Sequence, residues 1–230
     1  MNIISFCVYG KNPKYLNGLI ENIYLQPKIY PNWKVRAYVA ENVDPTLLHV
    51  LVDMMPDIDL VVLPPERGHL PMFWRFRPIE DYSIDRFIVR DTDSRLNPRE
   101  ADAVEEWIES GKSFHIMRDH PQHNVPICGG MWGADRYFIE RYGPEHQKNL
   151  SKFFNSLHTS APGRVFHQRG EYFNTDQPYL WTAVFPLLMS GEISSISHNK
   201  DKSLFRGVGD ERLFRIKNRD NSFVGQPFDI

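Results

Sequence analysis

Two aspartates, Asp91 and Asp93, stand one residue apart directly after an apolar run in the segment RFIVRDTDSRLNPRE, residues 86–100. Residues two apart on an extended backbone point to the same side, so both carboxylates can face one ligand. Two like charges this close repel each other and favour a compensating cation. A divalent ion is a common solution, because Mg²⁺ and Mn²⁺ prefer oxygen ligands. The alternative is structural, with Asp91 paired to Arg90 or Arg95 and Asp93 capping the following turn.

The segments around this pair alternate between strand and helix patterns. Strands are predicted at residues 3–10, 34–40, 59–64, 86–96, 113–119 and 193–198. Helices are predicted at residues 12–30, 44–55, 97–111, 135–143, 146–158 and 176–191, with a long loop at 120–133. Strands that lack a polar face and alternate with helices favour an α/β fold, a Rossmann-like, mainly parallel sheet flanked by helices on both faces. In such a sheet ligands bind beyond the carboxyl ends of the strands, which is where the aspartates stand.

The composition sets limits on partners and compartment. The 230 residues carry 27 basic and 29 acidic side chains, a formal net charge of −2, so no global field favours nucleic acid or an anionic membrane. Cys7 and Cys128 make no disulfide framework, and a zinc site built on His120, His123 and Cys128 would lack a fourth ligand. We find neither a signal-peptide pattern nor an apolar run of about 18 residues, and expect a cytoplasmic protein with no transmembrane segment.

Four motifs in order, D-T-D, H-I-M-R-D-H-P, G-G-M-W-G and D-Q, resemble a group of small glycosyltransferase-like proteins of the GT-A fold found in bacteria and viruses. The resemblance covers most of residues 1–200. It implies one GT-A-like domain over residues 1–230, with a nucleotide-binding half at 1–120 and an acceptor-side half at 121–200. The C-terminal tail, residues 201–230, lies outside the resemblance. The oligomeric state is not legible from the sequence.

The activity that this resemblance implies is metal-dependent transfer of a sugar from a nucleotide diphosphate sugar, UDP-linked in our prediction, to the hydroxyl of a carbohydrate acceptor, as in glycan or polysaccharide synthesis. Asp91 and Asp93 are then expected to hold Mn²⁺ or Mg²⁺ and the ribose. His198, at the end of the strand predicted at residues 193–198, is expected to complete the metal site.

The nucleotide is expected at the end of the first strand, where Tyr9 and Gly10 would lie against the base, as in similar folds. Core packing of Tyr9 is the alternative. Arg75 and Arg90 are candidate phosphate contacts, because a guanidinium matches phosphate oxygens. Surface solvation of Arg75, or support of the aspartates by Arg90, would also explain these residues.

The acceptor is expected at the loop before residue 133. Gly129 and Gly130 would let the backbone approach a sugar, and Trp132 would offer a stacking face, with core packing of Trp132 as the alternative.

Asp176 and Gln177 open the helix predicted at residues 176–191, with Asn174 or Thr175 as the cap. By resemblance, Asp176 would contact the transferred sugar or accept the proton of the acceptor, and Gln177 would belong to the acceptor side. The alternative is that Asp176 only stabilises the first turn of the helix.

Two other classes of function remain open. A metal-dependent nucleotidyltransferase or phosphohydrolase could use the same aspartate pair, as could a non-catalytic nucleotide-sugar-binding domain. A nucleotidyltransferase of related fold usually has a phosphate loop rich in glycine and lysine after the first strand. The segment YGKNPKYLNG has only Gly10 and Gly18 and lacks that pattern, which disfavours this class.

Overall fold

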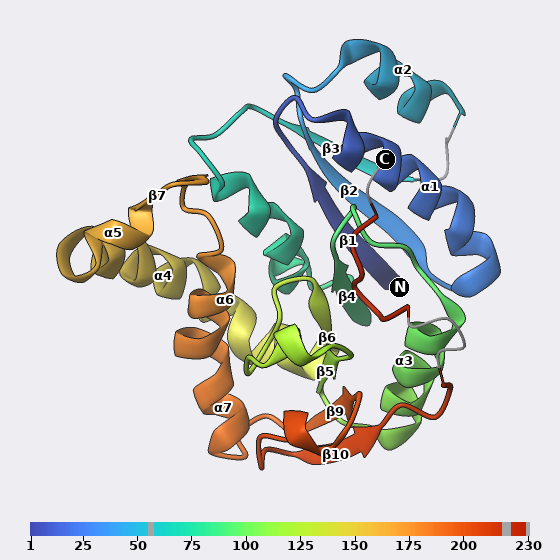
Figure 1. Ribbon diagram of the computed structural model, residues 1–230, viewed down its shortest axis with the longest axis vertical. Helices are drawn as coiled ribbons and strands as arrows, with labels where there is room; N and C mark the ends of the chain where they lie inside the picture. Colours follow the sequence, from blue (N-terminus) through green and yellow to red (C-terminus); the bar gives the residue numbers. More distant parts are fainter. Residues whose placement is uncertain (55–57, 218–221, 229–230) are drawn as a thin grey trace.

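The computed structural model describes residues 1–54, 58–217 and 222–228 and contains an eight-stranded mixed sheet with the strand order β10-β9-β5-β6-β4-β1-β2-β3 (Figure 1). All neighbouring strands pair in parallel except β6, which is antiparallel to both β4 and β5. The strands are β1 (Asn2–Val8), β2 (Lys34–Ala40), β3 (Asp59–Leu63), β4 (Arg86–Arg90), β5 (Phe114–Arg118), β6 (Met131–Asp135), β9 (Ser195–Asn199) and β10 (Asp210–Leu213).

Helical segments connect the strands and cover both faces of the sheet. They are α1 (Pro13–Ile29), α2 (Pro45–Met54), the 3₁₀ segment η1 (Leu70–Glu80), α3 (Pro98–Ser110), η2 (Pro121–His123), α4 (Arg136–Ser160), α5 (Pro162–Val165), α6 (Asp176–Tyr179), the π-helical turn η3 (Leu180–Val184), α7 (Phe185–Met189) and η4 (Lys202–Leu204). A two-stranded hairpin, β7 (Phe166–His167) and β8 (Gly170–Glu171), follows α5.

The local sequence explains where the helices after β1 and β4, α1 and α3, begin, and where α3 ends. Asn12 accepts a hydrogen bond from the backbone N–H of Lys14 and caps α1, while Asn97 accepts from the N–H of Glu100 and caps α3. Gly111 ends α3 in the left-handed conformation, at φ 64°, which a glycine adopts without strain. The predicted positions of both helices are confirmed.

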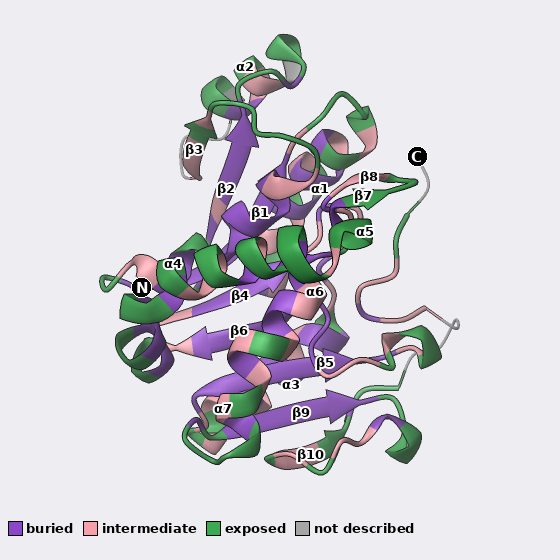
Figure 2. Ribbon diagram, turned by 90° about the vertical axis from the view of Figure 1, so that its left-hand side faces the viewer, coloured by how far each residue is buried: buried purple, intermediate pink, exposed green. Residues whose placement is uncertain are grey.

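Alternating residues of β4 enter two hydrophobic clusters on opposite faces of the sheet. Phe87 and Val89 pack with residues of η1, α4 and α6, whereas Ile88 packs with residues of α1 and α3. Figure 2 shows the central strands buried and the outer surface of α4 exposed. The same alternation decides which way the next residues, Arg90 and Asp91, point.

The α/β fold with a mainly parallel sheet is confirmed, and four details differ from the sequence prediction. The fourth strand ends at Arg90 instead of residue 96. The predicted loop at 120–133 contains the start of β6, a strand whose sequence MWGAD is too short and mixed to give a strand pattern. The two helices predicted at 135–143 and 146–158 form one helix, α4. The strand β10 and the hairpin of β7 and β8 were not predicted.

Two further expectations concern the cysteines and the membrane. Cys7 and Cys128 are both free and buried. Across residues 1–54, 58–217 and 222–228, none of the helices has the length and apolar character needed to cross a membrane.

Candidate functional site

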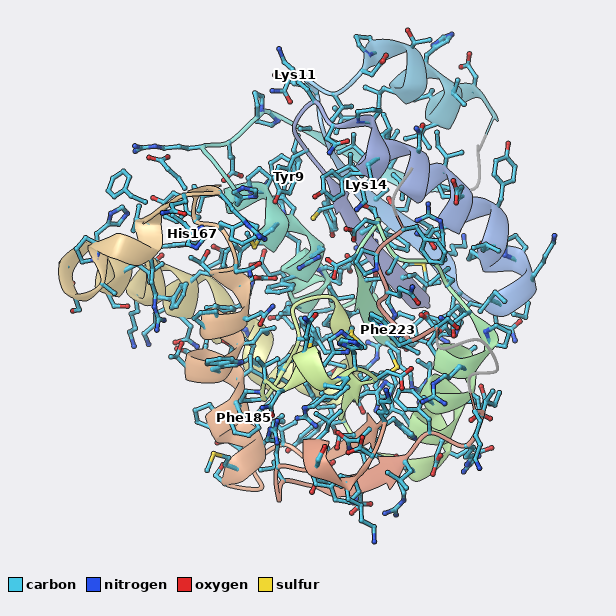
Figure 3. The ribbon with its side chains drawn as sticks, viewed as in Figure 1. Tyr9, Lys11, Lys14, His167, Phe185 and Phe223 are labelled. Carbon is cyan, nitrogen blue, oxygen red and sulfur yellow. The ribbon has the colours of Figure 1, made fainter. Side chains whose placement is uncertain are left out.

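A cavity of about 480 Å³ opens where β1 and β4 end at the same edge of the sheet. Its walls come from the turn after β1, the start of α1, η1, the turn after β4 and the segment before α6. In Figure 3, Tyr9, Lys11 and Lys14 lie around the turn between β1 and α1. The lining residues are Cys7, Tyr9, Gly10, Lys11, Asn12, Tyr15, Gly68, His69, Met72, Arg75, Asp91, Thr92, Asp93, Phe173, Asn174 and Asp176.

Arg75, from η1, connects the two acidic parts of this cavity. One of its terminal nitrogens, Nη1, donates to Asp91 Oδ1, and the other, Nη2, donates to Asp176 Oδ2 at 2.7 Å. Arg75 is 7% exposed and Asp176 is 3% exposed, so the ion pair between them is desolvated. Burial disfavours the charge of Arg75, but the two carboxylates outweigh it and raise the pKa of Arg75. A single guanidinium therefore fixes carboxylates from two separate elements.

Burial gives Asp176 an unusual proton affinity. Burial raises the pKa of its carboxyl above the usual range, the negative charge of Asp91 adds to this, and Arg75 offsets part of the shift. A raised pKa makes a carboxylate a stronger base, which suits it to accepting a proton.

Gly129 and Gly130 make room for these two carboxylates. A Cβ atom built on Gly129 would lie 2.0 Å from Asp176 Oδ2, and one on Gly130 would lie 2.0 Å from Asp91 Oδ2. The antiparallel register pairs Arg90 with Met131, which places Gly130 opposite Asp91. The expected close approach of backbone is thus present, but it is to the protein's own aspartates. The role of these glycines in acceptor binding stays a prediction.

Asp93 also lines the cavity, although it lies in a turn beyond the strand. Lys14 Nζ is 3.4 Å from Asp93 Oδ2. Burial raises the pKa of Asp93, the charge of Asp91 raises it further, and Lys14 offsets only part of the shift. The Asp93 carboxylate is therefore in a position where additional positive charge is favourable.

The donor set agrees only in part with a metal site. Asp91 and Asp93 supply the carboxylate oxygens that Mn²⁺ or Mg²⁺ prefers, and the raised pKa of Asp93 fits a carboxylate that lacks full charge compensation. Within residues 1–54, 58–217 and 222–228, no three side chains of His, Cys, Asp or Glu gather in a group that could hold an ion. An ion held here would need further ligands from a bound molecule or from water.

Helix α1 fixes the turn that carries the aspartates. A Cβ atom on Gly18 would lie 2.0 Å from the carbonyl oxygen of Thr92, so only glycine allows this close approach. The Asn22 side chain donates to the carbonyl of Ser94 at 2.8 Å and accepts from the N–H of Leu96 at 2.9 Å. The turn after β4 is therefore held from outside the cavity.

The opposite wall of the cavity is aromatic. The Tyr9 hydroxyl lies 2.8 Å from His69 Nδ1, and His69 Nε2 lies 3.1 Å from the carbonyl oxygen of Arg169. Because a carbonyl only accepts, Nε2 of the neutral ring carries the proton and Tyr9 donates to Nδ1. The rings of His69 and Phe173 meet edge to face, with centroids 5.3 Å apart. Tyr9 and Gly10 line the cavity, but their predicted contact with a base remains a prediction.

Arg90 does not line the cavity, so its predicted contact with a phosphate is wrong for this structure. It is 2% exposed, and its Nε donates to Glu100 of α3 at 3.2 Å. The cause is the alternation along β4, which turns Arg90 towards α3 and Asp91 towards η1. The alternative considered for Asp91, pairing with Arg90 or Arg95, is also wrong, because its partner is Arg75.

Trp132 belongs to the hydrophobic core, and the prediction of a sugar-stacking face is wrong. It is 0% exposed, and its ring packs against Phe76, Phe87 and Phe114 with centroids 5.2 to 5.3 Å apart. It is a residue of β6 on the same face as Phe87 and Val89. A tryptophan in an unrecognised central strand is buried by the sheet itself.

His198 is separated from the aspartates, and its predicted role as a metal ligand is wrong. Strands β5 and β6 lie between β9 and β4, a separation of roughly 14 Å at the usual spacing of neighbouring strands. The ring of His198 is fully buried, 2.9 Å from His115 and 3.1 Å from Glu106 of α3. It therefore faces α3, whereas Asp91 faces η1.

The alternative zinc site is likewise not assembled. No group of three metal-ligating residues includes His120, His123 or Cys128 in the part of the chain that the structure describes. The ring of His120 stacks on Phe223 of the C-terminal tail, with centroids 4.3 Å apart, and that of His123 meets Phe223 edge to face.

Gln177 is half-buried and does not line the cavity, so its role towards the acceptor stays a prediction. Sequence reasoning missed His69, which lines the cavity, and Lys14, whose Nζ lies 3.4 Å from Asp93 Oδ2. Lys14 had a usable signal, because it follows the first strand closely and the ends of parallel strands share one edge of the sheet. His69 had none, because it lies in a segment with no strand or helix pattern.

No family model matches the sequence, and no curated protein matches it. Solved structures match the fold. A crystal structure of an active-site variant of LgtC aligns with a TM-score of 0.50 and 10% identity, over 87% of this chain and 73% of that chain. The chain has the fold of GT-A glycosyltransferases. At this identity the likeness establishes the fold alone.

Two other GT-A-like neighbours align less well. A glycosyltransferase involved in glycosylation of the major capsid of PBCV-1 has a TM-score of 0.44 and 17% identity, over 86% of this chain and 81% of that chain. The mannosyltransferase PcManGT from Pyrobaculum calidifontis, in complex with GDP-Man and Mn²⁺, has a TM-score of 0.45 and 16% identity, over 62% of this chain. The aligned part spans 46% of PcManGT and 35% of S. aureus TarS, less than half the length of either.

Proposed function

We propose that this protein is a glycosyltransferase that moves a sugar from a nucleotide diphosphate sugar, UDP-linked, to an acceptor hydroxyl. The observation that carries the proposal is the meeting of Asp91, Asp93 and Asp176 around one cavity at the carboxyl ends of β1 and β4. In open α/β sheets ligands bind at this edge, and about 480 Å³ is within the size range of small-molecule sites.

The donor would lie along this cavity. The aromatic wall of Tyr9 and His69 suits the face of a base. Lys11, which lines the cavity, and Lys14, which pairs with Asp93, suit a diphosphate, because ammonium groups attract phosphate oxygens. Asp93 and Asp91 would hold Mn²⁺ or Mg²⁺ together with the donor. Such an ion neutralises charge on the diphosphate when it is bound.

Arg75 and Asp176 would act at the transferred sugar. In the reaction the bond from the anomeric carbon to the diphosphate oxygen breaks with its electron pair on the diphosphate. The acceptor oxygen forms the new bond, and its proton must leave. Asp176 is proposed either to receive that proton or to hold the transferred sugar, and Arg75 positions it from behind. Arg75 is then a positioning residue, because its two terminal nitrogens are engaged by carboxylates.

The test is incubation of the purified protein with Mn²⁺ and a panel of UDP, GDP and dTDP sugars, with nucleoside diphosphate release measured over hours. We expect metal-dependent release of UDP from at least one sugar. Binding without release would instead support a nucleotide-sugar-binding domain. Release of nucleoside monophosphate and sugar 1-phosphate would support a phosphohydrolase. Formation of nucleoside triphosphate when pyrophosphate is added would support a nucleotidyltransferase.

A further inference from the structure

The segment just before Asp176 has an uncommon backbone conformation. Tyr172 and Asn174 have φ angles of 60° and 53°, and they are the non-glycine residues with positive φ in the part of the chain that the structure describes. L residues rarely adopt this left-handed conformation, and asparagine tolerates it better than most. Such conformations persist where neighbouring contacts impose them, and they are frequent at ligand sites.

Neighbouring hydrogen bonds hold this turn in place. The Tyr172 N–H donates to the carbonyl of Val165 at 3.0 Å, and the Thr175 hydroxyl donates to the carbonyl of Tyr172 at 2.8 Å. The Tyr172 hydroxyl lies 3.1 Å from His158 Nε2 of α4. The conformation is therefore imposed by α4, α5 and the start of α6.

Two residues of this turn lie at the cavity. Phe173 and Asn174 both line it, and Asp176 follows two residues later. The Phe173 ring packs on His69 and on His167 of β7, with centroids 5.3 and 5.2 Å apart, so it belongs to the aromatic wall. Asn174 lies in sequence between that wall and the acidic end of the cavity.

The side chain of Asn174 makes no hydrogen bond that would give it a structural role among the described residues. Of the two predicted caps, Thr175 occupies the capping position, without a side-chain capping bond, and Asn174 lies outside it. The Asn174 residue is exposed, and no hydrogen bond to its carboxamide occurs within residues 1–54, 58–217 and 222–228. An uncommitted amide is therefore held at the cavity by a backbone conformation that most residues disfavour.

We infer that the Asn174 carboxamide binds hydroxyl groups of the transferred sugar and takes part in choosing that sugar. An uncharged amide both donates and accepts hydrogen bonds, which matches a sugar hydroxyl. A phosphate would instead favour a cationic side chain such as Lys11. This inference rests on the proposed function. It assigns Asn174 to the sugar end of the cavity, next to Asp176.

The test compares Asn174→Gly with wild type. Glycine adopts the left-handed conformation freely, so this variant keeps the backbone and removes only the carboxamide. Titration calorimetry with Mn²⁺ would use the best-bound nucleotide sugar of a UDP, GDP and dTDP panel, and separately its free nucleoside diphosphate. We expect about 3- to 10-fold weaker binding of the nucleotide sugar, the loss of a neutral hydrogen bond, and unchanged binding of the nucleoside diphosphate. Asn155→Ala, on the exposed side of α4, is the matched control and should bind both ligands like wild type.

Each other outcome overturns the inference. Wild-type affinity of Asn174→Gly for both ligands would mean that the residue serves the backbone alone. Equal weakening for both ligands would move the contact from the sugar to the nucleotide. A wild-type protein that binds no nucleotide sugar of the panel would remove the proposed function and this inference together.

Discussion

Arg75 and Arg90 are both buried arginines paired with carboxylates, yet they serve opposite faces of the sheet. Arg90 and Glu100 are each about 2% exposed at their side chains, and this pair is sealed between β4 and α3. Arg75 is also buried, with 8% of its side chain exposed, but its partner Asp91 has a side chain that is 42% exposed and lines the cavity. A buried ion pair therefore says little about function by itself. The Arg75 cluster differs because one of its carboxylates, Asp91, faces the cavity.

The largest expected effect is on turnover, when a carboxylate of the Arg75 cluster is neutralised and compared with one of the Arg90–Glu100 pair. Asp176→Asn should slow transfer by about 10³, because general acid–base residues typically contribute 10²- to 10⁴-fold. Its affinity for UDP should stay near wild type. Glu100→Gln, the matched change in the sealed cluster, should leave turnover of the folded protein unchanged. Steady-state kinetics measures the turnover of both variants, and calorimetry measures their affinity for UDP. Equal turnover in the two variants would mean that Asp176 only stabilises the first turn of its helix.

The next effect compares the two arginines directly. Arg75→Lys and Arg90→Lys keep the charge but lose the rigid planar arrangement of donors. Each should lower the free energy of unfolding by roughly 1–3 kcal/mol, because buried acceptors lose a partner. Transfer should fall about 10²-fold in Arg75→Lys alone, since Asp91 and Asp176 would shift. Urea denaturation gives the stability and a turnover assay gives the rate. A comparable rate loss in Arg90→Lys would erase the distinction between the clusters.

A smaller effect is expected when the space around the Asp91 carboxylate is filled. Gly130→Ala would place a methyl group where the Asp91 carboxylate now lies, and we expect about 10-fold weaker Mn²⁺-dependent binding of UDP as the carboxylate moves. Gly163→Ala, in α5, is the matched control, because a Cβ atom there meets no heavy atom within 4 Å. Calorimetry of both variants would show the contrast. Wild-type UDP binding by Gly130→Ala would mean that the position of Asp91 does not matter for the donor.

The smallest effect is a shift in pH dependence. Transfer that needs ionised Asp176 is lost as pH falls through the pKa of this residue, and burial together with Asp91 raises that pKa. The acid limb of kcat should therefore lie above the ordinary aspartate value of about 3.9. Asp91→Asn removes one raising charge and should move the limb to lower pH. Glu100 also has a pKa raised by burial, yet Glu100→Gln should leave the limb in place. If Asp91→Asn leaves the acid limb in place, the limb reports the titration of a group other than Asp176.

The sequence was sufficient for the fold because the first half of the chain has strong local signals. Apolar runs, asparagine caps and Gly111 predict the strands β1 to β5 and the helices α1 to α3, but not η1, and the end of β4 puts Asp91 and Asp93 at the edge where β1 also ends. Arg75, a predicted site residue, lines the cavity, and its predicted contact with a phosphate stays a prediction. Its partners Asp91 and Asp176 are 16 and 101 positions away in the chain, and no local pattern reveals them.

The predictions that failed share a physical cause. Arg90, Trp132 and His198 were assigned by their order along the chain, whereas the sheet sorts them by face and by strand position. The antiparallel strand β6 is not recognisable from the sequence, so the prediction puts Trp132 in a loop and leaves β6 out between β4 and β9. Side-chain direction in a strand is settled by pairing partners, which a single sequence does not specify.

The central claim is that the cavity beside the Arg75 cluster holds the diphosphate of the donor. A crystal structure of the protein with UDP and Mn²⁺ tests it most directly. We expect the diphosphate next to Lys11, with Mn²⁺ between it and Asp93, the base against Tyr9, and the sealed Arg90–Glu100 pair unchanged. UDP bound elsewhere on the molecule, with the cavity holding only water at saturating UDP, would contradict the account.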